Sequence, residues 1–309
     1  MGVPSQTRST SSRPASAFVI VNADDYGYFP GVSQGILDAA RGGVVTATGI
    51  LATSPYFATH VPWLTACAEV DVGVHLNLTT GRPLTGAMAA VLGRWGGEFP
   101  GKYAMAVAVS TGRVPLAVVE GEWRAQIQRC VDAGLRLYFL NSHEHLHVLP
   151  SLARLSHRLA EAFDILFVRR PVPEWRYGLT PGGIVRNATL CACDRANDAL
   201  RRPFTPILLG IGQSGRLDLP YLRRTFATLR RGEVYELMCH PGYHQADELA
   251  DPRLLAYHRW EQELTALSGE PIRDLLRELH VEPIRYRDLA DGVTGHGAAE
   301  TRRQEVAHG

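Results

Sequence analysis

The stretch AFVIVNADDYGYFPGVSQGILDAARGG, residues 17–43, contains one complete strand-then-helix unit. Its first five residues are apolar and rich in β-branched side chains, which predicts a buried strand. Residues 31–43 carry apolar side chains at helical spacing and end in two glycines, which predicts an amphipathic helix with a glycine stop. Two carboxylates, Asp24 and Asp25, stand between them. Adjacent like charges at the end of a buried strand repel one another unless a partner compensates them.

The same alternation recurs along the chain. Further apolar runs of strand length are followed by segments with helical spacing. Strands are expected within 44–52, 70–78, 135–141, 164–170, 204–211 and 234–240, and helices within 54–69, 119–134, 150–163, 219–232 and 253–269. About seven such units favour an α/β fold of the (β/α) barrel type, complete or distorted, over a doubly wound sheet with a second domain. The strands are not followed by a glycine-rich phosphate-binding motif.

The expected domain organisation is one barrel domain over residues 17–292, between flexible tails at 1–16 and 293–309. Both tails are poor in apolar residues and cannot bury a core. Two stretches, 83–118 and 171–204, interrupt the alternation and are predicted to be insertions at the C-terminal mouth of the barrel. Insertions on that face commonly shape a substrate pocket.

Composition narrows the choice of partners. The chain has 32 Lys and Arg against 31 Asp and Glu, so its overall charge does not favour nucleic acid as a partner. Its apolar runs fall short of the roughly 18 residues needed to cross a bilayer, so stable membrane insertion is not expected. The odd number of scattered cysteines argues against a disulfide framework and favours the cytoplasm. Cys191 and Cys193 are close enough to bind a metal together, but a second Cys/His pair is missing nearby.

Polar side chains collect where the predicted strands end. In a parallel barrel all these positions meet at the C-terminal mouth, where active sites of this fold lie. The residues concerned are Asp24, Asp25, His75, His143, His145, His147, Arg169, Arg170 and His240.

Each of these residues also has a structural explanation. Paired aspartates before a turn are common helix or turn caps, and a histidine in an apolar strand is often a hydrogen-bonded core residue. The segment NSHEHLHVLP, residues 141–150, is harder to explain in this way because it holds three histidines within five residues. One aspartate and two histidines suffice to bind a divalent cation, and the second aspartate is then a candidate base. Zn²⁺ and its transition-metal neighbours, including Mn²⁺, suit such ligands, and Mg²⁺ is the alternative.

Five ordered stretches resemble the YdjC-like carbohydrate deacetylases. They are VNADDYGYFPGVSQGI (21–36), VGVHLNLTTGRPL (72–84), NSHEHLHVLP (141–150), VRRP (168–171) and ELMCHPGY (236–243). The family removes N-acetyl groups from amino sugars, and some members are associated with hopanoid lipid biosynthesis. The resemblance therefore implies a barrel-like, metal-dependent hydrolase that releases acetate from an N-acetylated oligosaccharide, glycoside or glycolipid. It also implies a homodimer.

The resemblance implies roles for individual residues. Asp25, His75 and His143 are expected to bind the metal, Asp24 to act as the base that activates the attacking water, and His240 to protonate the leaving amine.

Supporting roles are expected for neighbouring residues. Arg170 is expected to hold Asp24 ionised or to position a sugar hydroxyl, with Arg169 as the alternative because adjacent strand residues point to opposite faces. Asn141 stands where many family members have Asp, so a supporting hydrogen bond is expected to differ here. The residues expected to contact substrate or to support the ligands are His145, His147, Asn77 and Tyr26.

Two other functions fit parts of the pattern. H-x-H also occurs in barrel metallohydrolases of the amidohydrolase and phosphodiesterase types, but those usually carry it on the first strand, which here ends in Asp24 and Asp25. A catalytically silent sugar-binding protein is the second alternative. The presence of both aspartates and of all the motif histidines argues against it.

Overall fold

The computed structural model describes residues 16–177, 180–201, 205–248 and 251–292. The tails expected at 1–16 and 293–309 lie outside these residues, apart from Ser16. The extent of the barrel domain, 17–292, stays a prediction. Within the described ranges, the helices are all too short or too polar to cross a membrane.

A single parallel sheet forms the centre of the molecule. Its order is β5-β4-β3-β2-β1-β7-β6, and β8 pairs with the first residues of β1. The sheet is curled, and because β5 and β6 remain unpaired edges of this order within the ranges given above, it forms an open half-barrel, which confirms the prediction of a distorted (β/α) barrel. The strands are β1 (Ala17–Tyr26), β2 (Ala47–Ile50), β3 (Asp71–Leu76), β4 (Leu137–Ser142), β5 (Phe167–Val168), β6 (Ile207–Leu209), β7 (Val234–Cys239) and β8 (Val281–Pro283).

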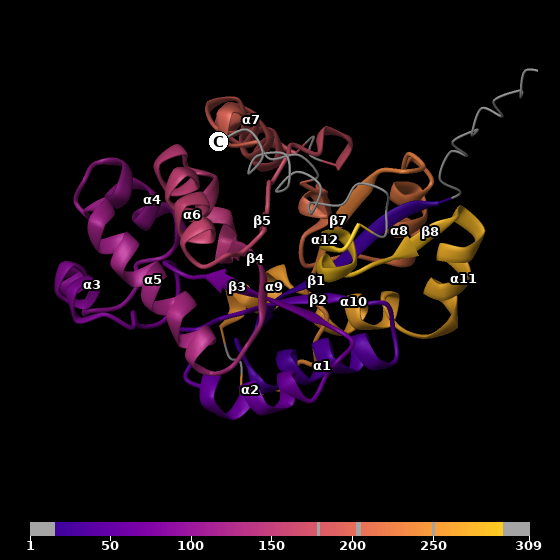
Figure 1. Ribbon diagram of the computed structural model, residues 1–309, viewed down its shortest axis with the longest axis horizontal. Helices are drawn as coiled ribbons and strands as arrows, with labels where there is room; N and C mark the ends of the chain where they lie inside the picture. Colours follow the sequence, from indigo (N-terminus) through magenta and orange to yellow (C-terminus); the bar gives the residue numbers. More distant parts are fainter. Residues whose placement is uncertain (1–15, 178–179, 202–204, 249–250, 293–309) are drawn as a thin grey trace, which may run out of the picture.

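Helices surround the sheet, as Figure 1 shows, with α1 and α2 on one side of it and α5 and α6 beside β3 and β4. Every residue of β1 is buried, as expected for a parallel strand covered on both faces. The helices that alternate with the strands are α1 (Pro30–Arg41), α2 (Phe57–Thr65), α5 (Leu116–Asp132), α6 (Pro150–Ala162), α8 (Leu219–Phe226), α9 (Pro252–Tyr257), α10 (Trp260–Ala266), α11 (Gly269–Leu279) and α12 (Tyr286–Ala290).

The two predicted insertions are largely helical. Both reach the short 3₁₀ segment η2 (His143–Val148) that follows β4, because α4 and α7 contact it. They therefore lie at the C-terminal end of the sheet, as predicted. The first insertion contains α3 (Gly86–Val91), η1 (Leu92–Trp95) and α4 (Lys102–Ser110), and the second contains η3 (Trp175–Tyr177), α7 (Pro181–Ala196) and η4 (Asp198–Leu200). A further 3₁₀ turn, η5 (Ile211–Gln213), follows β6.

The prediction of one continuous helix within 253–269 is wrong, because the structure has two helices there, α9 and α10, with a break between them. At the break the Arg259 N–H donates to the Gly215 carbonyl at 2.7 Å instead of continuing the helical ladder. His258 is buried at this point with 7% of its surface exposed. A tertiary contact thus overrides the helical spacing of the sequence.

The chain after β7 is held close to α1. A Cβ atom on Gly35 would lie 2.4 Å from the Gly242 Cα, so only glycine permits the contact. The Tyr243 N–H also donates to the Gly31 carbonyl at 3.0 Å. These contacts fix the loop that begins with His240.

Candidate metal centre and active site

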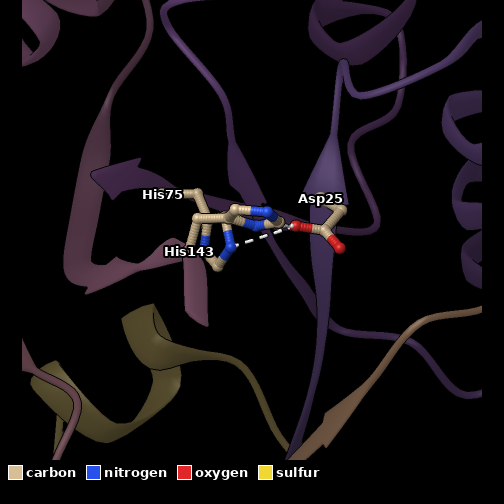
Figure 2. A group of neighbouring side chains, drawn as sticks. All are labelled: Asp25, His75 and His143. Carbon is tan, nitrogen blue, oxygen red and sulfur yellow. Dashed lines mark hydrogen bonds and ion pairs between the residues drawn. The ribbon is translucent and has the colours of Figure 1, made fainter. Parts of the chain in front are cut away.

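Asp25, His75 and His143 form a buried group at the C-terminal ends of β1, β3 and β4. One donor atom from each lies within 4.8 Å of the others. The Asp25 Oδ1 atom is 3.1 Å from His75 Nε2 and 2.8 Å from His143 Nδ1. Figure 2 shows the two imidazoles turned toward the carboxylate. The structure thus brings together the three residues expected as metal ligands.

The backbone of β1 explains how two adjacent aspartates reach one site. The pairing of β1 with β2 shifts register between Ala23 and Tyr26, as in a β-bulge. Asp25 lies in the left-handed region with φ 71°, which aspartate tolerates better than most residues. In a regular strand Asp24 and Asp25 would point to opposite faces. The bulge allows both carboxylates to face the mouth of the sheet.

Electrostatics favour the charged carboxylate at Asp25. Burial alone would raise its pKa, but the charge of His143 and hydrogen bonds from His143 and His75 hold the pKa well below its usual range. The same pairing raises the pKa of His143 although burial opposes it. A divalent cation would replace this stabilisation, because two imidazole nitrogens and one carboxylate oxygen suit Zn²⁺ and related ions. The residues present therefore fit a metal.

Asn141 orients His75. Its Nδ2 donates to Asp24 Oδ1 at 2.9 Å, so its Oδ1 faces His75 Nδ1 at 2.7 Å and must accept a hydrogen bond from it. His75 therefore carries a proton on Nδ1, and Nε2 is the ring atom that lies beside Asp25 and would meet a cation there. An outer hydrogen bond of this kind fixes the tautomer of a ligating histidine.

Replacing Asn141 with leucine is expected to weaken Zn²⁺ binding by about 10- to 100-fold, because the His75 tautomer is no longer fixed. Competition with a chromogenic chelator measures this affinity. Asn141→Asp keeps an acceptor for His75 and should restore most of it. Equal affinity in the leucine variant and the unchanged protein would show that Asn141 does not orient the ligand.

Arg169 ties Asp24 to the far side of the half-barrel. Its guanidinium contacts both oxygens of Asp24, with Nη2 2.8 Å from Oδ1, and its Nε donates to Glu236 Oε1 on β7 at 2.7 Å. Asn22 also donates to this Glu236 oxygen at 2.8 Å. Burial would raise the pKa of Asp24, but the charge of Arg169 outweighs it and the pKa is lowered. Asp24 is therefore ionised at neutral pH.

The expected contact between Arg170 and Asp24 is wrong. Arg170 turns away and binds Asp194 of α7, with Nε–Oδ1 and Nη2–Oδ2 distances of 2.6 and 2.8 Å. The physical reason is the alternation of side chains along an extended segment, which places Arg169 inside the half-barrel and Arg170 outside it.

This pair of neighbouring arginines yields a stability prediction. Arg169→Leu leaves two buried carboxylates unpaired and is expected to lower the free energy of unfolding by about 3–5 kcal/mol. Arg170→Leu removes a partly exposed ion pair and should cost about 0–1 kcal/mol. Urea unfolding followed by circular dichroism measures both. Similar losses in the two variants would contradict the assignment of the buried pair to Arg169.

His240 lies at the end of β7, with 6% of its surface exposed. Its backbone N–H donates to Glu263 Oε2 at 2.5 Å. The residue before His240, Cys239, pairs with Ala23 of β1, so His240 and Asp24 follow neighbouring positions at the ends of two adjacent strands. His240 is not part of the Asp25 group found among the described residues.

The two remaining histidines of the 141–150 stretch, His147 and His145, have different surroundings. His147 bonds through both ring nitrogens, to Ser142 Oγ at 2.6 Å and to the Arg169 carbonyl at 2.9 Å, so it braces the site and is not free to bind substrate. Burial lowers its pKa to about 3. His145 is half-buried in the left-handed region with φ 59°, and its buried Nδ1 has no hydrogen-bond partner within the described ranges.

Asn77 shapes the loop after β3. Its Oδ1 accepts the N–H groups of Thr79 and Thr80, and its Nδ2 donates to Thr53 Oγ1 at 2.7 Å. Tyr26, expected to contact substrate or to support the ligands, is fully buried, and its hydroxyl donates to the carbonyl of His60, in α2, at 2.8 Å, so it does not face a substrate.

Tyr28 was not among the predicted site residues. Its ring packs edge-on against His143 with centroids 5.3 Å apart. It also lines a cleft of about 440 Å³ whose walls include Thr53, Tyr56 and Thr80. Tyr28 therefore contacts both this cleft and His143, one of the metal-ligand candidates. Tyr28 lies in the 21–36 stretch, and its closeness in sequence to Asp24 and Asp25 could have indicated that it belongs to the site.

Comparison with known proteins gives consistent matches. The family described as YdjC-like protein matches residues 18–278. A carbohydrate deacetylase of Geobacillus stearothermophilus is 31% identical over 273 residues, covering 88% of this chain and 98% of the relative. A carbohydrate deacetylase of Homo sapiens is 30% identical over 249 residues, covering 75% and 76%. A crystal structure from Enterococcus faecalis, provisionally described as a cellobiose-phosphate cleavage protein, aligns with a TM-score of 0.70 at 23% identity over 89% of this chain and 99% of that one, which shows a shared fold.

Proposed function

The chain belongs to the YdjC-like family, and from this premise we propose that it is a metal-dependent hydrolase that removes the N-acetyl group from an amino sugar. The observation that carries the proposal is the buried Asp25, His75 and His143 group with a second carboxylate, Asp24, beside it. The relatives named carbohydrate deacetylase support the sugar and the reaction. The products are acetate and a free amino sugar.

We assign Asp25, His75 and His143 as the ligands of a divalent cation, Zn²⁺, Mn²⁺ or Mg²⁺. When bound, such an ion supplies Lewis acidity toward the amide carbonyl and makes water easier to deprotonate. The ion also compensates the negative charge of two neighbouring carboxylates. This compensation explains why a buried strand ends in Asp24 and Asp25.

Asp24 is the proposed general base. Arg169 and Asn141 hold its carboxylate in one position through three hydrogen bonds. A fixed, ionised carboxylate is ready to accept the proton of the attacking water. The low pKa that Arg169 imposes makes it a weak base, so its contribution depends on position more than on basicity.

His240 is the proposed general acid. It donates a proton to the amide nitrogen as the C–N bond breaks, which allows the amine to leave as a neutral group. The sugar is proposed to enter through the cleft beside Tyr28, where aromatic and hydroxyl groups provide an apolar face and hydrogen bonds. The homodimer and the cytoplasmic location stay predictions from the sequence.

Acetate release tests this function. Chelated protein is incubated with N-acetylglucosamine as monomer, oligomer and lipid glycoside, with and without Zn²⁺, Mn²⁺ or Mg²⁺. Metal-dependent acetate release from at least one sugar is expected. Hydrolysis of phosphodiesters or cyclic amides without any acetate release would overturn the proposal.

A further inference from the structure

His258 packs against His240 although the chain has to break a helix to bring it there. Its ring centroid lies 5.0 Å from that of His240, with the planes tilted by 60°. On its other side it stacks on Trp260 at 4.7 Å and 15°. The residue sits between α9 and α10, where the sequence predicts a continuous helix. The break between α9 and α10 therefore allows the His258 imidazole to lie beside His240.

The surroundings leave little freedom to His258. Gly215 has φ +77°, and a Cβ atom there would lie 2.9 Å from the Tyr257 carbonyl and 3.2 Å from His258 Nδ1. Only glycine allows this close approach without a shift of the imidazole. The Arg259 N–H bond to the Gly215 carbonyl holds the same junction. The position of His258 is therefore determined by the fold around it.

Few groups are available to pair with the His240 ring. The charged groups that face it are Glu263 from α10 and Asp24 from β1. Glu263 Oε2 lies 4.0 Å from His240 Nδ1 and already accepts the backbone N–H of His240. In the described part of the chain, His240 Nδ1 is buried without a hydrogen-bond partner, and so is His258 Nδ1.

His258 stays neutral under ordinary conditions. Burial and the nearby charge of His240 lower its pKa to about 3, although the charge of Asp25 opposes this. The charge of His143 acts on it in the same direction as that of His240. A neutral imidazole always has one nitrogen with a free lone pair. His258 is therefore an acceptor that does not compete for the proton of His240.

We propose that His258 is a positioning residue, which accepts the Nδ1–H of His240 while His240 holds the proton destined for the leaving amine. This inference rests on the proposed function. A protonated His240 has an N–H on each ring nitrogen, and in this proposal its Nδ1–H is donated to the neutral ring of His258, whose centroid lies 5.0 Å away. The Nε2 proton then passes to the amide nitrogen as the C–N bond breaks, and His240 is left neutral.

Three variants test the proposal: His258→Phe, His258→Asn and, as a matched control, His244→Phe. His244 also stacks on Trp260, at 6.4 Å, but it is exposed. Each variant is assayed on an N-acetyl amino sugar and on 4-nitrophenyl acetate, whose phenolate leaves without a proton. Thermal unfolding confirms that the variants are folded.

The expected result is a loss of kcat by about 10- to 100-fold on the amide for His258→Phe and at most about threefold on the ester. His258→Asn keeps an acceptor and should recover part of the amide activity, and His244→Phe should change neither reaction. Equal losses on amide and ester, or full amide activity in His258→Phe, would overturn the role of His258 and leave the proposed function standing. A wild-type protein that releases acetate from the ester and from no amide would overturn the proposed function itself.

Discussion

Replacing Asp24 with asparagine is expected to lower kcat for acetate release by about 10³- to 10⁴-fold, because the amide cannot take the proton of the attacking water. Asparagine keeps nearly the same shape, and its Oδ1 still accepts hydrogen bonds from Arg169. Steady-state kinetics on the best N-acetyl sugar, together with metal analysis of the same preparation, measure the effect. The metal content should stay near that of the unchanged protein because Asp24 is not among the assigned ligands.

Asp194→Asn is the matched control for this variant. Asp194 is also a carboxylate bound by an arginine, Arg170, but it lies on α7 and does not contact Asp24. Its replacement should leave kcat within about twofold, as for most surface changes away from a site. Turnover in Asp24→Asn above a tenth of the original value would remove Asp24 as the base.

Replacing Asp25 with alanine is expected to weaken metal binding strongly and, at the metal concentration that saturates the unchanged protein, to abolish acetate release. Two histidines without the carboxylate provide too few ligands for a stable site, so metal affinity should fall by at least about 100-fold. In addition, His143 and His75 lose the carboxylate oxygen that both now contact. Isothermal titration with Zn²⁺ and acetate assays on the same sample measure the two effects.

Adding excess metal shows whether a variant is inactive because it binds metal weakly or because it has lost a catalytic group. Millimolar Zn²⁺ should restore part of the activity of Asp25→Ala, since the two histidines remain, whereas it should not restore Asp24→Asn. If Asp25→Ala binds one equivalent of metal as tightly as the unchanged protein, the ligand assignment is wrong. The two aspartates thus have separable phenotypes despite being neighbours in sequence.

Much of the fold follows from local pattern. The apolar run at 17–21, the alternation of strands and helices after it and the polar strand ends together predict a parallel barrel with a site at its mouth. The meeting of strand ends in this fold also predicts the wider set of polar residues at the mouth, and the resemblance to the YdjC-like family selects Asp25, His75 and His143 from that set. The sequence did not distinguish a complete barrel from a distorted one, so the opening between β5 and β6 was only one of two predicted possibilities.

Other features depend on contacts that no local pattern reveals. To tell whether Arg169 or Arg170 points into the half-barrel, one must know which face each residue of the extended segment occupies. The strand in that segment, β5, has only two residues and gives little indication. The bulge at Asp25 reverses the facing that strict alternation predicts. His258 lies in a stretch with helical spacing, and only the packing of Gly215 and Trp260 breaks the helix there.

The most direct test of the account is a titration of chelated protein with Zn²⁺ in which acetate release from an N-acetyl sugar is followed as metal is added. The account predicts that activity rises in proportion to added metal and levels off at one ion per chain. The His75→Ala protein, measured alongside, should show no rise in the same range. Full activity in the metal-free protein, or a rise that is unchanged without His75, would contradict a metal centre at Asp25, His75 and His143.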